Sequence, residues 1–268
     1  MQMPRLGQGT WNMGDSAANR TEELATLREG IELDMTMIDT AEMYGSGRSE
    51  SLVGEAIAGQ REKIFLVTKV LPSNASRKGT IRACEASLKR LQTDRVELYL
   101  LHWTGSYPLE ETVRGFEDLL AAGKIRSWGV SNLNLSEMNQ LVGLPGGKAC
   151  AANQVLYNLS RRGIEFDLLP WSRERGIPIM AYTPIEQGRI LGNRALGEVA
   201  KRLGATPAQV ALAWVLRQEG VVTIPKASSV AHVRENRKAR DLRLDAESLN
   251  VLDSAFPPPN RARPLEML

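Results

Sequence analysis

The chain has 268 residues, enough for one large domain or two small ones. Hydrophobic residues make up 43% and charged residues 24%, a globular composition that excludes intrinsic disorder and collagen-like repeats. The net charge of +3, from 34 Lys and Arg against 31 Asp and Glu, is too small and too scattered to indicate a nucleic-acid-binding surface.

Short apolar runs recur along the chain. They are near-continuously apolar rather than alternating, which is typical of parallel strands buried on both faces. A first strand is predicted at residues 6–10, where two glycines weaken the pattern. The other predicted strands are residues 37–39, 65–68, 98–101, 128–131, 150–154, 179–182 and 221–224.

The segments between these runs have helical signals. Residues 77–91 place four apolar side chains on one face at spacings of three and four. Thr206 and Pro207 form a helix start, with threonine as the N-cap and proline in the first helical position. The predicted helices are 48–58, 77–91, 109–122, one that begins at Thr206, 228–239 and 246–255.

The spacing of the strands indicates the architecture. The predicted strand ends lie about 31 residues apart on average, close to the ~30 residues of one βαβ unit. Eight such units predict an α/β protein, a (β/α)8 TIM barrel with parallel strands in a single domain over residues 1–268. A doubly wound sheet would need a glycine-rich phosphate loop, and neither Gly7-x-Gly9 nor Gly45-x-Gly47 has the third glycine.

Several protein classes are disfavoured by the rest of the chain. Cys84 and Cys150 cannot build a disulfide scaffold, and His102 and His232 lie too far apart in the chain for a histidine-rich metal site. No apolar stretch approaches the ~18–20 residues that cross a bilayer, and the start lacks a secretion signal. We expect a cytoplasmic monomer with no metal, nucleic-acid or membrane partner.

Polar residues stand at or just past the predicted strand ends. Singly, each has an ordinary structural explanation, such as a helix cap, a solvated charge or a buried histidine that is hydrogen-bonded. In a barrel, however, the active site lies at the carboxyl ends of the strands, where these side chains would converge. The set is Asp39, Lys69, His102, Asn132, Gln154 and Tyr182, with Tyr44 five positions after Asp39.

These residue types suit proton transfer to a carbonyl oxygen. A free tyrosine has a pKa of about 10, too high for efficient acid–base chemistry at neutral pH. A nearby lysine would lower that pKa, an aspartate would hold the lysine, and a neutral histidine would orient the carbonyl. Since no nucleophile elbow or carboxylate pair is present, the redox equivalent must come from a bound hydride carrier.

Eight motifs follow one another in a fixed order. They lie at residues 6–11, 38–45, 67–70, 100–103, 123–132, 153–158, 181–184 and 224–229, with Glu235-Asn236 after the last. Over essentially its whole length the chain resembles the aldo-keto reductases. The resemblance implies a (β/α)8 barrel that reduces an aldehyde or ketone with NADPH through Asp39, Tyr44, Lys69 and His102, with Tyr44 as the proton donor.

The resemblance also implies how the cofactor is held. Ser131, Asn132 and Gln154 would bind the carboxamide and Tyr182 would stack on the nicotinamide. Residues 183–189 would meet the pyrophosphate, Lys226 and Ser228 the 2′-phosphate, and Glu235 and Asn236 the adenine. The complete implied set is Thr10, Trp11, Asp39, Ser131, Asn132, Gln154, Tyr182, Thr183, Pro184, Ile185, Gln187, Gly188, Ile224, Lys226, Ser228, His232, Glu235 and Asn236.

Position 232 departs from the family pattern. Many members have an arginine where this chain has His232, so we expect a modest preference for NADPH, with NADH as a weaker alternative. For the substrate, the resemblance implies a pocket formed by Trp11, Tyr44, His102 and Trp103 and partly covered by the tail at 256–265. No arginine or lysine is clearly aimed inward, which predicts small, neutral or weakly polar aldehydes or ketones.

Two other functions remain open from the sequence. The first is a cofactor-binding, redox-sensing regulatory subunit of the same fold, against which the complete set of four catalytic-type residues argues. The second is a barrel lyase or isomerase of unrelated chemistry, which would need a metal or phosphate site.

Overall fold

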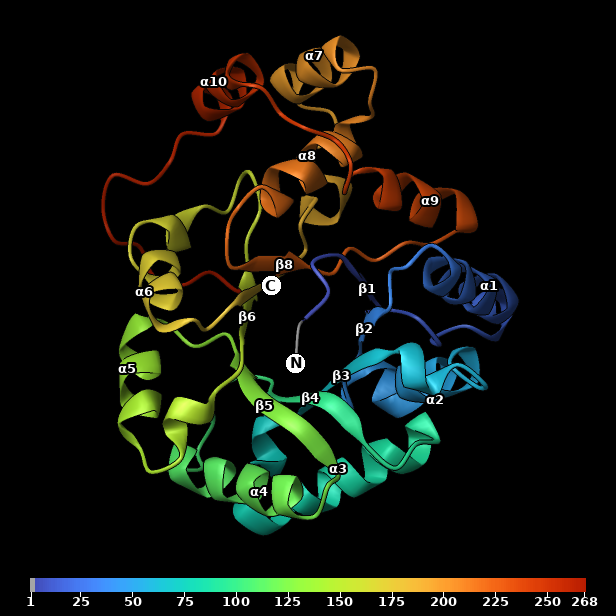
Figure 1. The fold of residues 1–268 in the computed structure, drawn as a ribbon, viewed down its shortest axis with the longest axis vertical. Coiled ribbons are helices and arrows are strands. Elements are labelled where there is room, and N and C mark those ends of the chain that lie inside the picture. Colours follow the sequence, from blue (N-terminus) through green and yellow to red (C-terminus); the bar gives the residue numbers. More distant parts are fainter. Residues whose placement is uncertain (1–2) are drawn as a thin grey trace.

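Eight parallel strands form the centre of the molecule (Figure 1). The computed structural model describes residues 3–268. The strands pair in chain order, and a parallel bridge between Leu6 and Thr223 joins the last strand to the first. The strands are β1 (Gly7–Gly9), β2 (Met37–Asp39), β3 (Phe65–Val70), β4 (Val96–Leu101), β5 (Ile125–Ser131), β6 (Asn153–Leu156), β7 (Ile179–Tyr182) and β8 (Val221–Thr223). The predicted (β/α)8 barrel is confirmed.

Helices form a ring outside the strands (Figure 1). Two helices, α7 and α8, lie between β7 and β8, which accounts for the longest predicted spacing between strands. The α-helices are α1 (Arg20–Glu32), α2 (Arg48–Ala56), α3 (Arg77–Leu91), α4 (Leu109–Ala121), α5 (Leu135–Gly143), α6 (Leu168–Arg175), α7 (Arg194–Arg202), α8 (Pro207–Leu216), α9 (Val230–Lys238) and α10 (Ala246–Ala255).

The sixth strand is displaced from its predicted position. It begins at Asn153 rather than residue 150 and continues to Leu156, so Gln154 lies inside β6 and not at its end. The sequence analysis places the end of this strand at Asn153 and Gln154 because both residues are polar. Both are buried, however, and the Asn153 side chain donates to the carbonyl of Leu133 at 2.8 Å. Buried polar groups with such partners are compatible with the middle of a strand.

The interior of the barrel has its own apolar layer. Successive side chains of a strand point to opposite faces, so every second residue faces the barrel axis. These inward residues form a cluster separate from the larger core between strands and helices: Met37, Phe65, Val67, Leu98, Leu100, Ala152, Met180, Val222 and Ile224. The layer closes the barrel beneath its carboxyl end.

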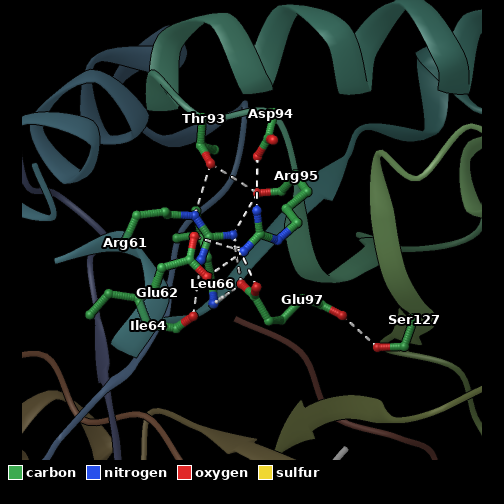
Figure 2. Close-up of polar contacts among 9 residues, drawn as sticks. All are labelled: Arg61, Glu62, Ile64, Leu66, Thr93, Asp94, Arg95, Glu97 and Ser127. Carbon is green, nitrogen blue, oxygen red and sulfur yellow. Dashed lines mark hydrogen bonds and ion pairs between the residues drawn. The ribbon is translucent and has the colours of Figure 1, made fainter. Parts of the chain in front are cut away.

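A charged network joins the other end of three neighbouring strands (Figure 2). Glu97, near the start of β4, is buried and receives two hydrogen bonds from the Arg61 guanidinium, at 2.8 and 3.1 Å. The same carboxylate accepts from the Leu66 amide of β3, and the Glu97 carbonyl accepts from Ser127 of β5. In barrels of this class the amino-terminal face contributes stability rather than catalysis. We therefore assign this network a structural role.

Candidate active site

Above the apolar layer, the inward positions become polar. A residue two positions after an inward apolar residue faces the same side of its strand. Met37, Val67, Leu100, Ala152 and Met180 are followed in this way by a second set, Asp39, Lys69, His102, Gln154 and Tyr182. The predicted convergence at the carboxyl ends of the strands is therefore present, and the alternation of each strand produces it.

Lys69 is the centre of this polar layer. Its side chain is fully buried, and its ammonium donates to three oxygens: Asp39 Oδ2 at 2.8 Å, the carbonyl of Thr40 at 2.8 Å and Tyr44 Oη at 3.1 Å. An ammonium group has three N–H donors, so every one has an acceptor. Burial opposes the charge, but Asp39 and Tyr44 favour it and the pKa of Lys69 is raised above its ordinary value.

The second oxygen of Asp39 is also occupied. Gln154 donates from Nε2 to Asp39 Oδ1 at 2.8 Å, and Asp39 is only 2% exposed. The resemblance assigned Gln154 to the carboxamide of the cofactor, whereas in this structure its amide nitrogen binds the aspartate. A buried carboxylate paired on both oxygens holds a fixed orientation, and with it the position of Lys69.

Tyr44 reaches Lys69 from a short turn after β2. The residues that follow it, Gly45, Ser46 and Gly47, all have left-handed backbone angles, with φ of 55°, 54° and 88°. Two glycines make this run accessible, because only glycine adopts such angles without steric cost. Burial raises the pKa of Tyr44 above 10, and the Lys69 ammonium lowers it by less. The lysine thus lowers this pKa as predicted, but burial, which the sequence analysis did not weigh, outweighs it.

His102 lies beside Tyr44 as a neutral ring. The two ring centroids are 5.8 Å apart in an edge-to-face arrangement, and the centroid of the Trp103 ring lies 4.7 Å from that of His102. Burial, with a smaller contribution from Lys69, lowers the pKa of His102 to about 3. A ring with so low a pKa is uncharged at neutral pH, which is the form that the sequence analysis expects. Its Nδ1 atom is buried without a hydrogen-bond partner in the part of the chain that the structure describes.

This protonation state has a consequence for stability. Between pH 6.5 and about 3 the unfolded chain binds a proton at His102 and the folded chain does not, so the free energy of unfolding falls as the pH falls. We expect wild type to lose about 2 kcal/mol more than His102→Asn between pH 7 and pH 4.5. Urea unfolding of both proteins at the two pH values measures the difference, and equal losses would contradict the buried neutral ring.

A second hydrogen-bonded group extends from β5 to β7. Asn132 donates to Ser131 Oγ at 3.1 Å and to the carbonyl of His102 at 3.2 Å, and Tyr182 donates to Asn132 Oδ1 at 3.0 Å. Asn132 has a φ of 61°, which turns it away from the strand and toward these partners. Burial raises the pKa of Tyr182 to about 12. Ser131, Asn132 and Tyr182 thus meet, as predicted, beside His102.

The loop between β7 and α7 has an unusual backbone. Thr183, Glu186 and Gln187 are left-handed, with φ of 52°, 50° and 54°. Sequence reasoning named Thr183, Pro184, Ile185, Gln187 and Gly188 here but missed Glu186. The Glu186 carboxylate is 5% exposed and accepts from three side chains of this region, Asn158, Arg161 and Arg189. Asn158 and Arg161 come from the loop after β6, and no local pattern signals partners that lie so far away in the chain.

The segment that leads into α9, together with the first turn of that helix, carries several predicted phosphate contacts. Lys226, Ser228 and His232 are exposed there, and Ser228 Oγ lies 3.2 Å from His232 Nδ1. The N-cap itself is Ser229, whose side chain accepts from the His232 amide. The remaining predicted cofactor-binding residues of this region are hydrogen-bonded within the protein or buried. The Glu235 carboxylate accepts from the Thr206 hydroxyl, while Asn236 and Ile224 are buried.

A cavity of about 520 Å³ adjoins the site. Trp103 and Asn132 line it together with tail residues 263–267, so this part of the tail lies against residues beside the site. Trp11 is 46% exposed, and Thr10 is buried. Arg161 and Arg263 are also among the residues that line the cavity. One of them, Arg161, is paired with Glu186 and Glu266.

Two other features of the described residues bear on function. Residues 3–268 contain no group of three His, Cys, Asp or Glu side chains placed to hold a metal ion. None of their helices is long and apolar enough to cross a membrane.

The barrel and this polar layer match a known family. The family model of the aldo/keto reductases matches residues 5–256, which is most of the chain. The chain belongs to the aldo/keto reductase family. This aldo-keto reductase is 52% identical to methylglyoxal reductase YeaE of Escherichia coli K12 over 100% of the chain and 96% of that protein. It is 33% identical to glyoxal reductase of Bacillus subtilis over 95% and 89% of the two proteins.

Solved structures agree with the sequence comparisons. The aldo/keto reductase of Klebsiella pneumoniae, crystallised with NADP and acetate, superposes with a TM-score of 0.98 at 49% identity, over 99% of this chain and 96% of that one. A second structure of the enzyme from the same organism contains NADPH, with the same TM-score and identity. This aldo-keto reductase therefore shares its full barrel with proteins crystallised with the nicotinamide cofactor.

Proposed function

We propose that this aldo-keto reductase reduces small aldehydes or ketones to alcohols with NADPH, and that Tyr44 donates the proton. The observation that carries the proposal is the hydrogen-bonding state of Lys69, whose third N–H points at Tyr44 Oη. A tyrosine oxygen that accepts from an ammonium keeps its own O–H free for another acceptor. At the mouth of the barrel, that acceptor is the carbonyl oxygen of the substrate.

The electrostatics fit this assignment of the proton donor. Tyr44 is protonated at neutral pH, as a proton donor must be, and the Lys69 ammonium offsets part of the rise in its pKa that burial causes. As negative charge develops on Tyr44 Oη, the Lys69 ammonium at 3.1 Å stabilises it. Asp39 holds Lys69 in place through the 2.8 Å ion pair. The neutral His102 can donate one N–H to the same carbonyl oxygen and fix its orientation.

The residues present suit a nicotinamide dinucleotide. Ser131 and Asn132 offer a hydroxyl and an amide beside the Tyr182 ring, the donors and acceptors that a carboxamide requires. Lys226 adds positive charge at the amino-terminal end of α9, a position that favours phosphate. When bound, the cofactor supplies the hydride. A single chain supplies all the residues in these roles. We therefore expect that one domain, in one copy of the chain, is sufficient to bind the cofactor and reduce the substrate.

A comparison of substrates and cofactors tests this function. The purified protein is mixed with NADPH or NADH and with methylglyoxal, an aromatic aldehyde or a ketone, and cofactor oxidation is followed by absorbance. We expect faster oxidation with methylglyoxal than with the ketone, because relatives are methylglyoxal and glyoxal reductases. Failure to oxidise either cofactor with any carbonyl compound would contradict the proposal.

His232 should set the margin between the two cofactors. It lies on the first turn of α9, with Nδ1 3.2 Å from Ser228 Oγ, and an imidazole offers a phosphate fewer N–H donors than a guanidinium does. We predict that His232→Arg tightens NADPH binding several-fold, up to about tenfold, because arginine can form a charge-assisted pair. NADH binding should stay nearly unchanged. Fluorescence titration measures both, and equal tightening would show that position 232 does not meet the 2′-phosphate.

A further inference from the structure

Behind the proposed proton donor lies a chain of buried hydroxyl groups. Thr40 Oγ1 donates to Ser49 Oγ at 3.1 Å, Ser49 Oγ lies 2.8 Å from Thr10 Oγ1, and Thr10 Oγ1 donates to the carbonyl of Asp39 at 2.9 Å. The three hydroxyl residues are each 0% exposed. They lie in three separate segments: the end of β1, the end of β2 and the first turn of α2.

The direction of these hydrogen bonds follows from proton counting. A hydroxyl has one proton, and Thr10 and Thr40 use theirs on the Asp39 carbonyl and on Ser49. Ser49 therefore accepts from Thr40 and donates toward Thr10, where the backbone oxygen is a second acceptor at 3.1 Å. Ser49 is the one member that joins both sides. No solvent reaches the group to replace a lost partner, so removing one hydroxyl leaves the others unsatisfied.

The chain of hydroxyls closes the loop that carries Tyr44. Thr40 stands at the beginning of that loop and Ser49 at its end, and the loop between them contains the left-handed run after Tyr44. The same residue, Thr40, supplies the carbonyl that accepts from the Lys69 ammonium at 2.8 Å. One end of the hydroxyl chain is therefore Thr40, whose carbonyl accepts from Lys69. The other end is Thr10, whose hydroxyl donates to the backbone carbonyl of Asp39.

We propose that Ser49 is a positioning residue for the reaction, which closes the Tyr44 loop and keeps the Thr40 carbonyl against Lys69. The proposal rests on the roles proposed above for Tyr44 and Lys69. Ser49 itself makes no hydrogen bond to Tyr44, Lys69 or His102 among the described residues, so it acts through Thr40. A displacement of about 1 Å in such a site is enough to slow the reaction by one or two orders of magnitude.

The test is Ser49→Ala with a matched control. Ser172→Ala removes another buried serine hydroxyl, but that hydroxyl has no hydrogen-bond partner among the described residues and lies in α6. We expect Ser49→Ala to lower kcat for aldehyde reduction about tenfold or more while the Kd for NADPH stays unchanged. Ser172→Ala should leave both values unchanged. A folded Ser49→Ala protein with wild-type kcat would overturn the proposal.

A second substitution, at Thr40, tests whether Ser49 acts through this hydrogen-bonded chain or merely disturbs the packing. Thr40→Val keeps the shape of the side chain and removes the hydroxyl that donates to Ser49. If the two residues act through one hydrogen-bonded chain, the double variant should be no slower than the slower single variant. Fully multiplicative losses would show two independent effects and overturn the proposal.

A third readout does not depend on activity. The titratable groups that face Tyr44 are Lys69, Asp39, His102 and Tyr182. If Lys69 is held less firmly, it stabilises the phenolate less. Ultraviolet titration of phenolate, with Tyr44→Phe subtracted, should give a pKa for Tyr44 higher by about half a unit or more in Ser49→Ala than in wild type. An unchanged pKa would overturn the proposal. An inactive wild type would overturn the function instead, and this titration would still decide the role of Ser49.

Discussion

Tyr44→Phe should lose aldehyde reduction by a factor of about 10²–10⁴ while NADPH binding survives. General acid catalysis by a positioned side chain contributes a factor of this size. The substitution keeps the ring that packs on His102 at 5.8 Å and removes only the oxygen that accepts from Lys69. Steady-state kinetics give the loss of kcat, and fluorescence titration gives the Kd for NADPH.

Tyr99→Phe is the matched control for this prediction. Tyr99 is fully buried on β4, and its hydroxyl has no hydrogen-bond partner among the described residues. Removing that hydroxyl should leave kcat unchanged, since the side chain lies in the core outside the strands. If Tyr44→Phe kept more than about a tenth of the wild-type rate with chemistry limiting, Tyr44 would not be the acid.

Lys69→Met should also inactivate the protein, by about a hundredfold or more at neutral pH. It removes the charge that stabilises Tyr44 as the proton leaves, so the pKa of Tyr44, already raised by burial, should rise further. In the direction of alcohol oxidation, the pH at which the rate reaches half its maximum should increase. The pH dependence of kcat in both directions measures this effect.

The same substitution affects stability, and this needs its own control. Without Lys69 the Asp39 carboxylate is buried and unpaired, and breaking such a pair costs about 3–5 kcal/mol. The double variant Asp39→Asn/Lys69→Met removes both charges and should recover most of that stability while staying inactive. Asp39→Asn alone should be milder than Lys69→Met, because the lysine charge remains. A fully active Lys69→Met protein would contradict the proposed role of the lysine.

Much of the fold follows from short-range signals in the sequence. The helix at Arg77–Leu91 has the predicted bounds because its apolar residues recur at spacings of three and four and Ser76 caps its start. Four helices, α1, α5, α6 and α7, were not predicted. In α6, Pro170 and few apolar residues obscure the periodic pattern in its eight residues. For β6, the apolar run begins before the ladder with β7 does, and pairing between strands is a tertiary property.

The sequence predicts which residues meet at the site more fully than it predicts the hydrogen bonds and pKa shifts among them. Strand alternation and chain order place Asp39, Lys69 and His102 together, and both are visible in the sequence. The net effect on the pKa of Tyr44 depends on how deeply the hydroxyl is buried, which the sequence does not give. The contact of Gln154 with Asp39 joins residues 115 positions apart, and no local pattern encodes such a pair.

The central claim is that this chain reduces a carbonyl compound with NADPH as the reductant. The ratio of alcohol formed to NADPH oxidised tests this claim most directly. Purified protein, NADPH and methylglyoxal are incubated with and without a metal chelator, and alcohol product and oxidised cofactor are both quantified. We predict one alcohol formed for each NADPH oxidised, with no effect of the chelator. NADPH binding without turnover would indicate a cofactor-sensing subunit. Product formed without NADPH and lost with the chelator would indicate a lyase or isomerase, and either result would contradict the claim.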